Sequence, residues 1–368
     1  MTSTLIWAIT AILGTSFLVC AVLVLTQRWH GRLSLDSDLG GIQKLHATPV
    51  PRVGGLGLII SLLIGIAVGH QLQGQTYQTA VLLLLAALPV FAAGILEDLT
   101  KKVSVRARLL ASFASAALAI VLADAQLTRL DTPLVDDLMM LAPLAFVFTC
   151  FAVGGMTNAV NIIDGLNGLA SGTVVIILAG LAAMAWQTND MLVMKLCLWG
   201  IAAMLGFMAF NFPFGRIFLG DGGAYLAGFW VASCAVLLLN RNPDVSTWAV
   251  LLSALYPVWE TVYSMYRRRV VSRVQTGLPD QGHLHHLVYR AIRQGGHVPA
   301  RPAWLAHGAA SLVLWLMVLV CQLAAFFYAS HHVGAMLATV AGAAVLTMLH
   351  HGLSSSNRSV VLGGKVVN

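Results

Sequence analysis

The chain has 368 residues, of which 58% are hydrophobic and only 10% charged, and it carries a formal net charge of +7. With a mean hydropathy of +0.84, it is too apolar for a water-soluble globular protein. Apolar runs of about 20 residues, the length of a bilayer-spanning helix, recur along it. The runs are continuous rather than alternating, which argues against a β-barrel. We therefore predict an all-α, polytopic transmembrane helix bundle.

The first apolar run covers residues 4–26. No Lys or Arg precedes it, and the first cation, Arg28, follows it, so we expect a retained helix with its N-terminus outside rather than a cleaved signal peptide. Two later runs contain Pro89 and Pro257, which a bundle tolerates where neighbouring groups satisfy the freed backbone. In chain order, the sequence predicts about eleven spans, over residues 4–26, 53–69, 79–96, 107–123, 135–153, 169–187, 191–209, 223–239, 247–265, 304–328 and 333–350.

The cations divide the connecting loops into two alternating sets. Of the 21 lysines and arginines, all but Arg129, Lys195 and Arg241 fall in one set or directly beside it. By the positive-inside rule this set is cytoplasmic, which predicts a bacterial inner-membrane protein with a periplasmic N-terminus and a cytoplasmic C-terminus. The basic balance is then a topology signal, and nucleic-acid binding is disfavoured. We expect one integral membrane domain over residues 1–353 and a disordered tail over residues 354–368.

Five polar motifs lie on the cation-rich side, and the first two flank the second and third spans. Before the second span, Lys44 and Arg52 lie in an extended, proline-rich segment. Either they bind phosphates, or they are ordinary cytoplasmic charges of the kind that the positive-inside rule describes. The third span ends with Glu97 and Asp98, adjacent carboxylates that repel each other unless a cation is near. They form either a solvated helix end or a metal-associated acid or base that acts on a phosphate.

The third motif, residues 158–168, reads NAVNIIDGLNG between two long apolar runs. Asn158, Asn161, Asp164 and Asn167 recur every three residues, so on a helix they form one slowly winding polar stripe. Their amide and carboxylate oxygens are hard ligands that suit Mg²⁺ better than zinc. Polar packing between helices is the alternative interpretation.

The fourth motif reads NFPFGRIFLGDGGAY and begins at Asn211. Asp221 lies among three glycines, in a loop that can turn tightly and offer backbone N–H groups to an anion. Phe218, three residues earlier, is placed to stack on a nucleobase. An ordinary glycine-rich turn is the alternative.

The fifth motif, residues 279–296, reads PDQGHLHHLVYRAIRQGG. Its apolar residues have helical spacing, which predicts a short amphipathic helix on the membrane interface with its cationic face toward phosphates. A zinc site is the runner-up for the histidines, but no cysteine or His-x-x-x-His pair supports it. The cationic face consists of His283, His286, Arg290 and Arg293, with His285 at its edge.

Together the five motifs favour one kind of chemistry. Carboxylate and amide oxygens hold Mg²⁺, and Lys, Arg and His hold phosphates, beside the same leaflet of the membrane. This combination fits phosphoryl transfer from a soluble, highly charged donor to a lipid-borne acceptor, with Mg²⁺ neutralising the donor diphosphate.

On the segments NAVNIIDGLNGLA, FLGDGGAY and PDQGHLHH, the sequence resembles the polyprenyl-phosphate N-acetylhexosamine-1-phosphate transferase family. This family includes phospho-N-acetylmuramoyl-pentapeptide transferase, and the histidine run is more similar to the branch that initiates O-antigen, enterobacterial common antigen and teichoic acid synthesis. The resemblance covers the chain from Lys44 to about His286. It implies that a UDP-activated N-acetylated sugar gives its sugar-1-phosphate to undecaprenyl phosphate and releases UMP. Mg²⁺, or Mn²⁺ in its place, is the implied cofactor.

The resemblance also implies roles for residues in the matching motifs. Asp98 would deprotonate the lipid phosphate, and Asp164 would be an essential carboxylate. Asp221 would bind Mg²⁺ with help from Asn161. The other residues assigned to substrate binding are Lys44, Arg52, Glu97, Asn158, Asn211, Phe218 (stacked on uracil), His283, His285 and His286.

Three positions depart from the family pattern. Glu97 replaces a usual aspartate, Asn167 replaces a common aspartate, and Gly223-Ala224 replaces a frequent Gly-Ser pair. We interpret these as subfamily variation, because an acid or an amide remains at the first two positions.

Two other classes of function are compatible with parts of the sequence. A secondary transporter would use intramembrane acids such as Glu260, although Arg267–Arg269 follow closely enough to neutralise it. A catalytically inactive scaffold is allowed by the departures at Glu97 and Asn167. The identity of the donor sugar and the existence of a homodimer stay open.

Overall fold

The computed structural model describes residues 3–35, 49–70, 75–271, 280, 282–294 and 302–363. Within these ranges the chain is helical, and an isolated antiparallel bridge joins Leu35 to Pro51. The predicted all-α bundle is thus confirmed. The helices are α1 (Ser3–Leu25), α2 (Gln27–Ser34), α3 (Gly55–His70), α4 (Gln75–Thr100), α5 (Val105–Ala123), α6 (Val135–Met139), α7 (Ala142–Ile162), α8 (Leu169–Gln187), α9 (Met191–Asn211), α10 (Gly220–Arg241), α11 (Thr247–Ser253), α12 (Leu255–Tyr266), the π-helix Arg267–Val271, α13 (Leu284–Gln294), α14 (Ala303–Phe327) and α15 (His332–Gly363).

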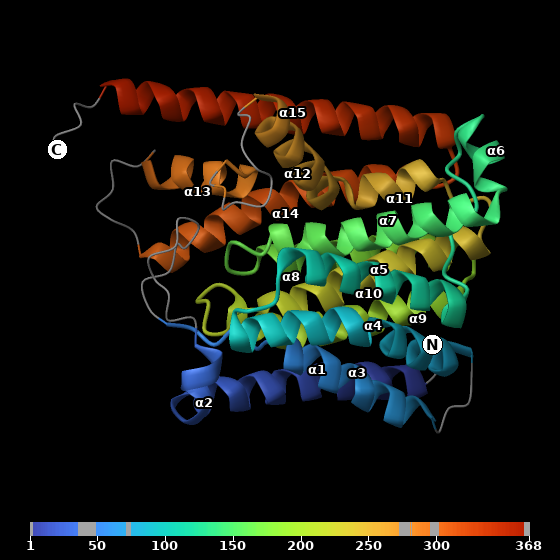
Figure 1. Cartoon of the computed structure of the whole chain (residues 1–368), viewed down its shortest axis with the longest axis horizontal. Coiled ribbons are helices and arrows are strands. Elements are labelled where there is room, and N and C mark those ends of the chain that lie inside the picture. The colour runs from blue at the N-terminus through green and yellow to red at the C-terminus, as the bar shows by residue number, and fades with distance from the viewer. Residues whose placement is uncertain are drawn as a thin grey trace.

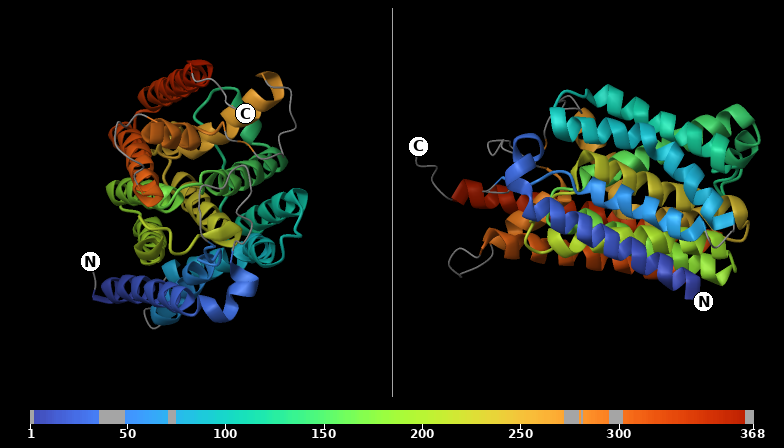
Figure 2. Two further views of the ribbon diagram at one scale, coloured as in Figure 1. Left: turned by 90° about the vertical axis from the view of Figure 1, so that its left-hand side faces the viewer. Right: turned by 90° about the horizontal axis from the view of Figure 1, so that it is seen from below.

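The long helices run along the long axis of the molecule and surround α10 (Figures 1 and 2). In its apolar span, 94% of the residues of α10 are buried, because α3, α4, α5, α7, α8 and α9 all pack against it. The corresponding share is 22% for α1 and 17% for α15, which lie at the periphery. The central helix therefore has protein neighbours on all sides, including around its first turn.

Nine helices in the described ranges are long and apolar enough to cross a membrane, and each overlaps a predicted span. Two predicted spans differ from this pattern. The apolar part of α3, Gly55–Val68, is shorter than the others, and residues 247–265 form two short helices, α11 and α12, instead of one. The predicted span at 135–153 also shifts, since α7 begins only at Ala142, with proline in its first turn, and continues to Ile162.

The two prolines inside predicted spans have different effects. Pro257 is the third residue of α12, and its ring disfavours a regular helical contact with the carbonyl of Ser253, the last residue of α11; here the helix is interrupted between Ser253 and Leu255. Pro89 lies inside an unbroken α4. The adjacent Val90 N–H donates to the Ser115 hydroxyl of α5 at 3.1 Å, so a neighbouring helix satisfies the backbone near Pro89.

Helix ends from distant parts of the chain meet at one end of the bundle, which we call the site end. Figure 1 shows α2, α13 and the C-terminal end of α15 at the site end, and α6 at the opposite end. The described parts of the five polar motifs lie in or beside the connections at the site end. The helix α15 continues to Gly363, so its last turns include residues for which the sequence predicts a disordered tail.

Candidate active site

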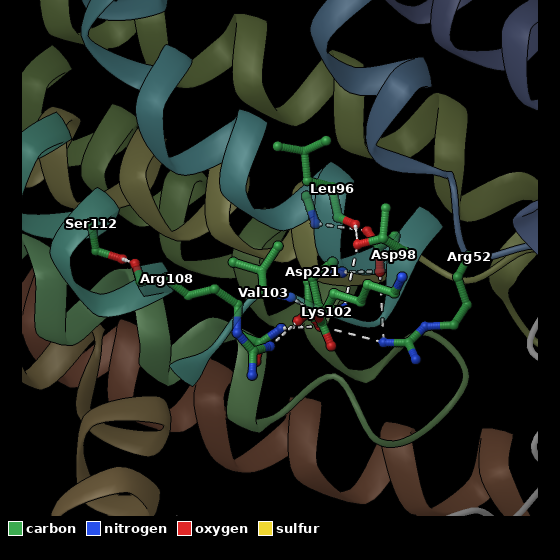
Figure 3. A network of polar contacts seen from close by, with 12 residues as sticks. Arg52, Leu96, Asp98, Lys102, Val103, Arg108, Ser112 and Asp221 are labelled. Carbon is green, nitrogen blue, oxygen red and sulfur yellow. Dashed lines mark hydrogen bonds and ion pairs between the residues drawn. The ribbon is translucent and has the colours of Figure 1, made fainter. Parts of the chain in front are cut away.

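The carboxylate of Asp98, at the end of α4, closes the N-terminus of α10 (Figure 3). It accepts the backbone N–H of Asp221 with Oδ1 and that of Gly222 with Oδ2, both at 2.9 Å. These N–H groups are in the first turn of α10 and have no partner within the helix. Asp98 is only 2% exposed. The anion predicted for the glycine-rich motif is therefore, in this structure, a carboxylate of the protein itself.

Glycines allow α4 and α10 to approach closely enough for this contact. Gly220 has a positive φ of 73°, and a Cβ there would lie 2.5 Å from Oδ2 of Asp98. Gly94 on α4 faces Gly222 on α10, where an added Cβ would lie 2.5 Å from the Gly222 Cα. Larger residues at these positions would separate Asp98 from the backbone that it holds.

Two arginines neutralise the Asp221 side chain from opposite sides (Figure 3). Nη2 of Arg52 lies 3.3 Å from Oδ1 of Asp221 and 3.7 Å from Oδ1 of Asp98, and Arg108 on α5 forms an ion pair with Oδ2 of Asp221. All three side chains are largely buried, which strengthens the charge interaction compared with a solvated pair. Sequence reasoning predicted Arg52 but counted Arg108 only as a topology charge. Arg108 lies in the first turn of α5, the helix that follows Glu97 and Asp98 in the chain. This closeness in sequence to the acidic pair could have identified it as a candidate site residue.

Asp164 lies just after α7, beside this cluster. Part of its surface is exposed, yet protein atoms surround it densely, and no described residue donates a hydrogen bond to its carboxylate. Burial raises the pKa of Asp164 to about 7; the charges of Asp221 and Asp98 act in the same direction, while Arg52 opposes them. The three acids Asp98, Asp164 and Asp221 thus form one electrostatic unit, as the sequence predicted.

The predicted polar stripe of the third motif is wrong, because α7 ends at Ile162 and only its first two asparagines are helical. The Asn161 amide N–H donates to Oδ1 of Asp221 at 3.0 Å and so belongs to the cluster. Asn158 instead faces α5, with its amide 3.3 Å from the Ser112 hydroxyl.

Asn167 is buried away from the cluster. Its amide N–H donates to the carbonyl of Pro213 at 2.8 Å. An aspartate at this position would present an acceptor to an acceptor, so the local structure explains the departure from the family pattern.

Asn211 and Phe218 organise the loops around the site. The Asn211 side chain accepts the Gly168 N–H at 2.7 Å and donates to the Ile217 carbonyl at 2.8 Å, and is 4% exposed. These contacts make Asn211 a connection between two loops rather than an open substrate contact.

Phe218 is half-buried, and its backbone N–H donates to the Pro51 carbonyl at 2.8 Å. This hydrogen bond holds the segment that contains Arg52 along the start of α10. Lys44 lies outside the described residues.

Glu97 serves the connection between α4 and α5. Its Oε2 accepts the backbone N–H of Val103 at 2.8 Å. The side chain is half-buried, and the described contacts do not include Asp221. By fixing the α4–α5 turn, Glu97 sets the start of the helix that carries Arg108.

The histidine motif reaches the cluster through Gly165. A Cβ on Gly165 would lie 2.6 Å from Nε2 of His285, so the glycine allows the ring to pack on the Asp164 loop. The ring of His285 lies 5.4 Å from that of His283 and 4.2 Å from that of His286. The structure therefore brings the histidines and Asp164 together, as predicted.

The predicted environment of the histidine helix is wrong in two respects. All three histidines are buried, at 8% exposure or less, and Figure 1 shows α13 running alongside α15 rather than across the end of the bundle. Burial lowers the pKa of His286 to about 4 and that of His285 well below its usual value. These two rings are therefore neutral near pH 7 and do not form a cationic face. Of the predicted arginines, Arg293 is exposed and contacts Tyr289.

The cluster offers some, but not all, of the ligands that a site for a hard divalent cation needs. Asp221 and Asp164 offer carboxylate oxygens, which Mg²⁺ prefers. Asn161 turns its N–H toward Asp221, so its amide orients that acid rather than extending the set of oxygens around it. Among the described residues, no group of three or more His, Cys, Asp or Glu side chains is arranged to hold a metal ion.

Comparisons with known proteins agree with this geometry. The model of the glycosyl transferase family 4 matches residues 80–239, which contain Asp98, Asp164 and Asp221. The chain is 30% identical over 245 residues to a probable undecaprenyl-phosphate N-acetylglucosaminyl 1-phosphate transferase of Bacillus subtilis, covering 66% of this chain and 67% of the relative. It is 27% identical over 263 residues to the undecaprenyl-phosphate alpha-N-acetylglucosaminyl 1-phosphate transferase of Yersinia pestis, covering 69% of each chain. For the enzyme of that name from Escherichia coli, the values are 28% over 306 residues, 79% and 82%. The chain therefore belongs to glycosyl transferase family 4, among the polyprenyl-phosphate N-acetylhexosamine-1-phosphate transferases.

Proposed function

We propose that this protein transfers N-acetylhexosamine-1-phosphate from a UDP-sugar to undecaprenyl phosphate, releases UMP, and so initiates the synthesis of a cell-surface glycan such as lipopolysaccharide O-antigen. The observation that carries the proposal is the convergence of Asp98, Asp221, Arg52 and Arg108 on the first turn of α10, at one end of a membrane bundle. The names of the relatives support undecaprenyl phosphate as the acceptor and N-acetylglucosamine as the first sugar to test.

The reaction is a displacement at phosphorus. A phosphate oxygen of undecaprenyl phosphate forms a bond to the sugar-bearing phosphorus of the donor, and the bond from that phosphorus to the UMP oxygen breaks. Negative charge on the donor diphosphate must be stabilised throughout. Arg52 and Arg108 are already oriented at this location, so we assign them to the diphosphate.

We assign the proton-accepting role to Asp164 rather than to Asp98. Both oxygens of Asp98 accept backbone N–H groups at the start of α10, so this acid positions Asp221. The carboxylate of Asp164 has no such donors, and its pKa of about 7 suits a base that removes the proton from a phosphate monoester, whose second pKa is about 6.

Mg²⁺, or Mn²⁺ in its place, is the cofactor that we propose for this site, with Asp221 as the carboxylate that would bind it. When bound, such an ion neutralises diphosphate charge. Asn161 would hold the Asp221 carboxylate in its orientation. A UDP-sugar is a cytosolic compound, which supports a cytoplasmic site end in a bacterial inner membrane.

Purified full-length protein in lipid nanodiscs tests the proposal. We expect radiolabelled UDP-N-acetylglucosamine to yield UMP and a lipid-linked product only when both undecaprenyl phosphate and Mg²⁺ are present. The Asp221→Asn variant should lose at least roughly a hundredfold in turnover, the scale of removing one transition-state interaction. Uptake of the donor into proteoliposomes without any lipid-linked product would instead identify a transporter, and absence of both with every UDP-N-acetylhexosamine tried would identify an inactive scaffold.

A further inference from the structure

Glu260 is a buried carboxylate that lies outside the region matched by the family model. It belongs to α12, is 1% exposed, and its oxygens point at the beginning of α13. The backbone N–H of Leu284, the first residue of α13, donates to Oε2 at 3.0 Å, and Nδ1 of His283 lies 2.8 Å from Oε1. Glu260 thus caps one helix and holds one imidazole with the same carboxylate.

The expected partners of Glu260 were Arg267–Arg269, the arginine run that follows it. Arg267 forms an ion pair with Asp280 instead. An unpaired carboxylate at this burial would be costly, and both His283 and the positive end of the α13 dipole help to compensate it. A substitution at Glu260 should therefore act first on the histidine motif.

The Glu260 contact determines how the His283 ring is oriented. Both oxygens of Glu260 also accept the Leu284 N–H, so we assign Nδ1 of His283 as the donor in this contact. Nε2, on the opposite side of the ring, lies 3.8 Å from Oδ2 of Asp280. The ring of His283 stacks nearly parallel to that of His285, with an interplanar angle of 10° and ring centroids 5.4 Å apart. His285 in turn packs on Gly165, next to Asp164. A continuous series of contacts links Glu260 to the acidic cluster.

The C-terminal helix supports the same segment from another direction. Nε2 of His350 on α15 donates to the carbonyl of Gly282 at 2.8 Å. The Gly282 N–H in turn donates to Asp280 at 2.9 Å. Residues on α12 and α15 therefore hold both sides of the turn that leads into α13.

We infer that Glu260 is a positioning residue for substrate binding: through His283 and the N-terminus of α13 it holds the three-histidine segment against the Asp164 loop, where the UDP-sugar would bind. This inference rests on the proposed function for the identity of the ligand. The placement of the segment itself depends only on the contacts described above.

The Glu260→Gln variant tests the inference with minimal change in shape. If the glutamine oxygen accepts the Leu284 N–H, its NH₂ group faces Nδ1 of His283 and forces the proton to the other ring nitrogen. We expect KM for the UDP-sugar to rise roughly tenfold, the scale of one misplaced buried hydrogen bond, with KM for undecaprenyl phosphate unchanged. In a His283→Asn background the same substitution should have no further effect on the donor KM, because the two residues act as one unit.

Asp190→Asn is the matched control. Asp190 is a 7% exposed carboxylate that caps α9 by accepting the N–H groups of Leu192 and Val193, in a connection opposite the site end. Both variants should lower the melting temperature, but only Glu260→Gln should raise the donor KM. Additive effects of Glu260→Gln and His283→Asn, or an equal rise in KM for both substrates, would overturn the inference.

Hydrogen exchange separates this inference from the proposed function. Backbone amides of 282–290 should exchange at least roughly tenfold faster in Glu260→Gln and at the wild-type rate in Asp190→Asn. Unchanged exchange in 282–290 would overturn the positioning role, whatever the activity. If the wild type formed no lipid-linked product while Glu260→Gln still accelerated exchange there, the proposed function would fail and the placement of the segment by Glu260 would stand.

Discussion

Asp98 and Asp221, which are 123 residues apart, are joined by a 2.9 Å hydrogen bond from the backbone N–H of Asp221 to the side chain of Asp98. The two acids therefore have different roles. Asp98 uses its carboxylate to hold the start of α10, and Asp221 uses its own to meet Arg52 and Arg108. The central acid of the site is positioned by a second acid that has no free oxygen.

The first prediction concerns Asp98→Asn. The amide can accept only one of the two backbone N–H groups and presents an NH₂ group to the other, so we expect a loss of about 1–3 kcal/mol in unfolding free energy together with a loss of turnover. Thermal unfolding and UMP release measure the two effects. The control is Asp136→Asn, since Asp136 accepts the N–H groups of Leu130 and Thr132 beside α6, at the opposite end. Normal turnover in Asp98→Asn, or lost turnover in the control, would contradict the positioning role.

The second prediction concerns Arg108→Gln. This change removes one of the two charges on Asp221 and, in our proposal, one ligand of the donor diphosphate. Turnover should fall at least roughly a hundredfold, as it does when one charge-stabilising donor is removed from an active site. Arg106→Gln is the matched control, because Arg106 is exposed and lies on the same turn of α5. Equal activities of the two variants would show that Arg108 acts only as a charge that sets membrane topology and has no role in turnover.

Much of the site could be predicted from the sequence, since Asp98, Asp164, Asp221 and the histidines occur in compact motifs on one side of the membrane pattern. Their individual partners could not be predicted. The contact between Asp98 and the α10 backbone depends on how two helices pack at Gly94 and Gly222, which no local pattern encodes. The polar stripe failed because α7 ends at Ile162, so a three-residue spacing no longer describes one helix face.

The same limit explains the residues that were missed or misread. Arg108 was fully explained by the positive-inside rule, so its ion pair with Asp221 was not predicted. For Glu260 we considered only the nearest arginines in sequence, whereas the structure shows a contact with His283, 23 residues later. Long apolar helices were predictable in approximate place because length and composition determine them, whereas about eleven spans were predicted and nine helices in the described ranges meet the length and hydropathy of a span. The break before Pro257 also required knowledge of the neighbouring helices.

The third prediction concerns pH. Burial raises the pKa of Asp164 to about 7 in the folded protein, above its unfolded value of 3.8, so the folded state binds more protons between these values. The stabilising contribution of Asp164 is therefore present below about pH 4 and is lost as the pH rises toward 7. Compared with Asp164→Asn, the wild-type unfolding free energy should decrease over this window. The lowered pKa of His286 acts in the opposite direction but is common to both proteins. Parallel stability curves would contradict the buried, unpaired environment of Asp164.

The fourth prediction concerns the close contact between Gly165 and His285. Gly165→Ala would place a Cβ 2.6 Å from Nε2 of His285, so the histidine segment must move away from the Asp164 loop. We expect a loss of about 1–3 kcal/mol in stability and a higher KM for the UDP-sugar. Gly155→Ala is the control, because a Cβ at Gly155 on α7 meets no atom within 4 Å. If both variants behaved alike, the contact between α13 and the Asp164 loop would not govern donor binding.

The fifth prediction concerns Asn167→Asp, which installs the residue common in the family. The new carboxylate would face the Pro213 carbonyl without a donor between them, and we expect a loss of about 1–3 kcal/mol. Thermal unfolding of this variant and of Asn189→Asp, at an exposed turn, provides the comparison. A stable Asn167→Asp variant would show that the buried amide is not required by its partner.

The most direct test of the central claim is an experimental structure with UDP-N-acetylglucosamine and Mg²⁺ bound. The account predicts that the diphosphate oxygens lie within ion-pair distance, about 4 Å, of the guanidinium groups of Arg52 and Arg108. The diphosphate should also lie next to Asp221 and to the histidine segment. A diphosphate bound away from the first turn of α10, with these arginines still engaged on Asp221 alone, would contradict it.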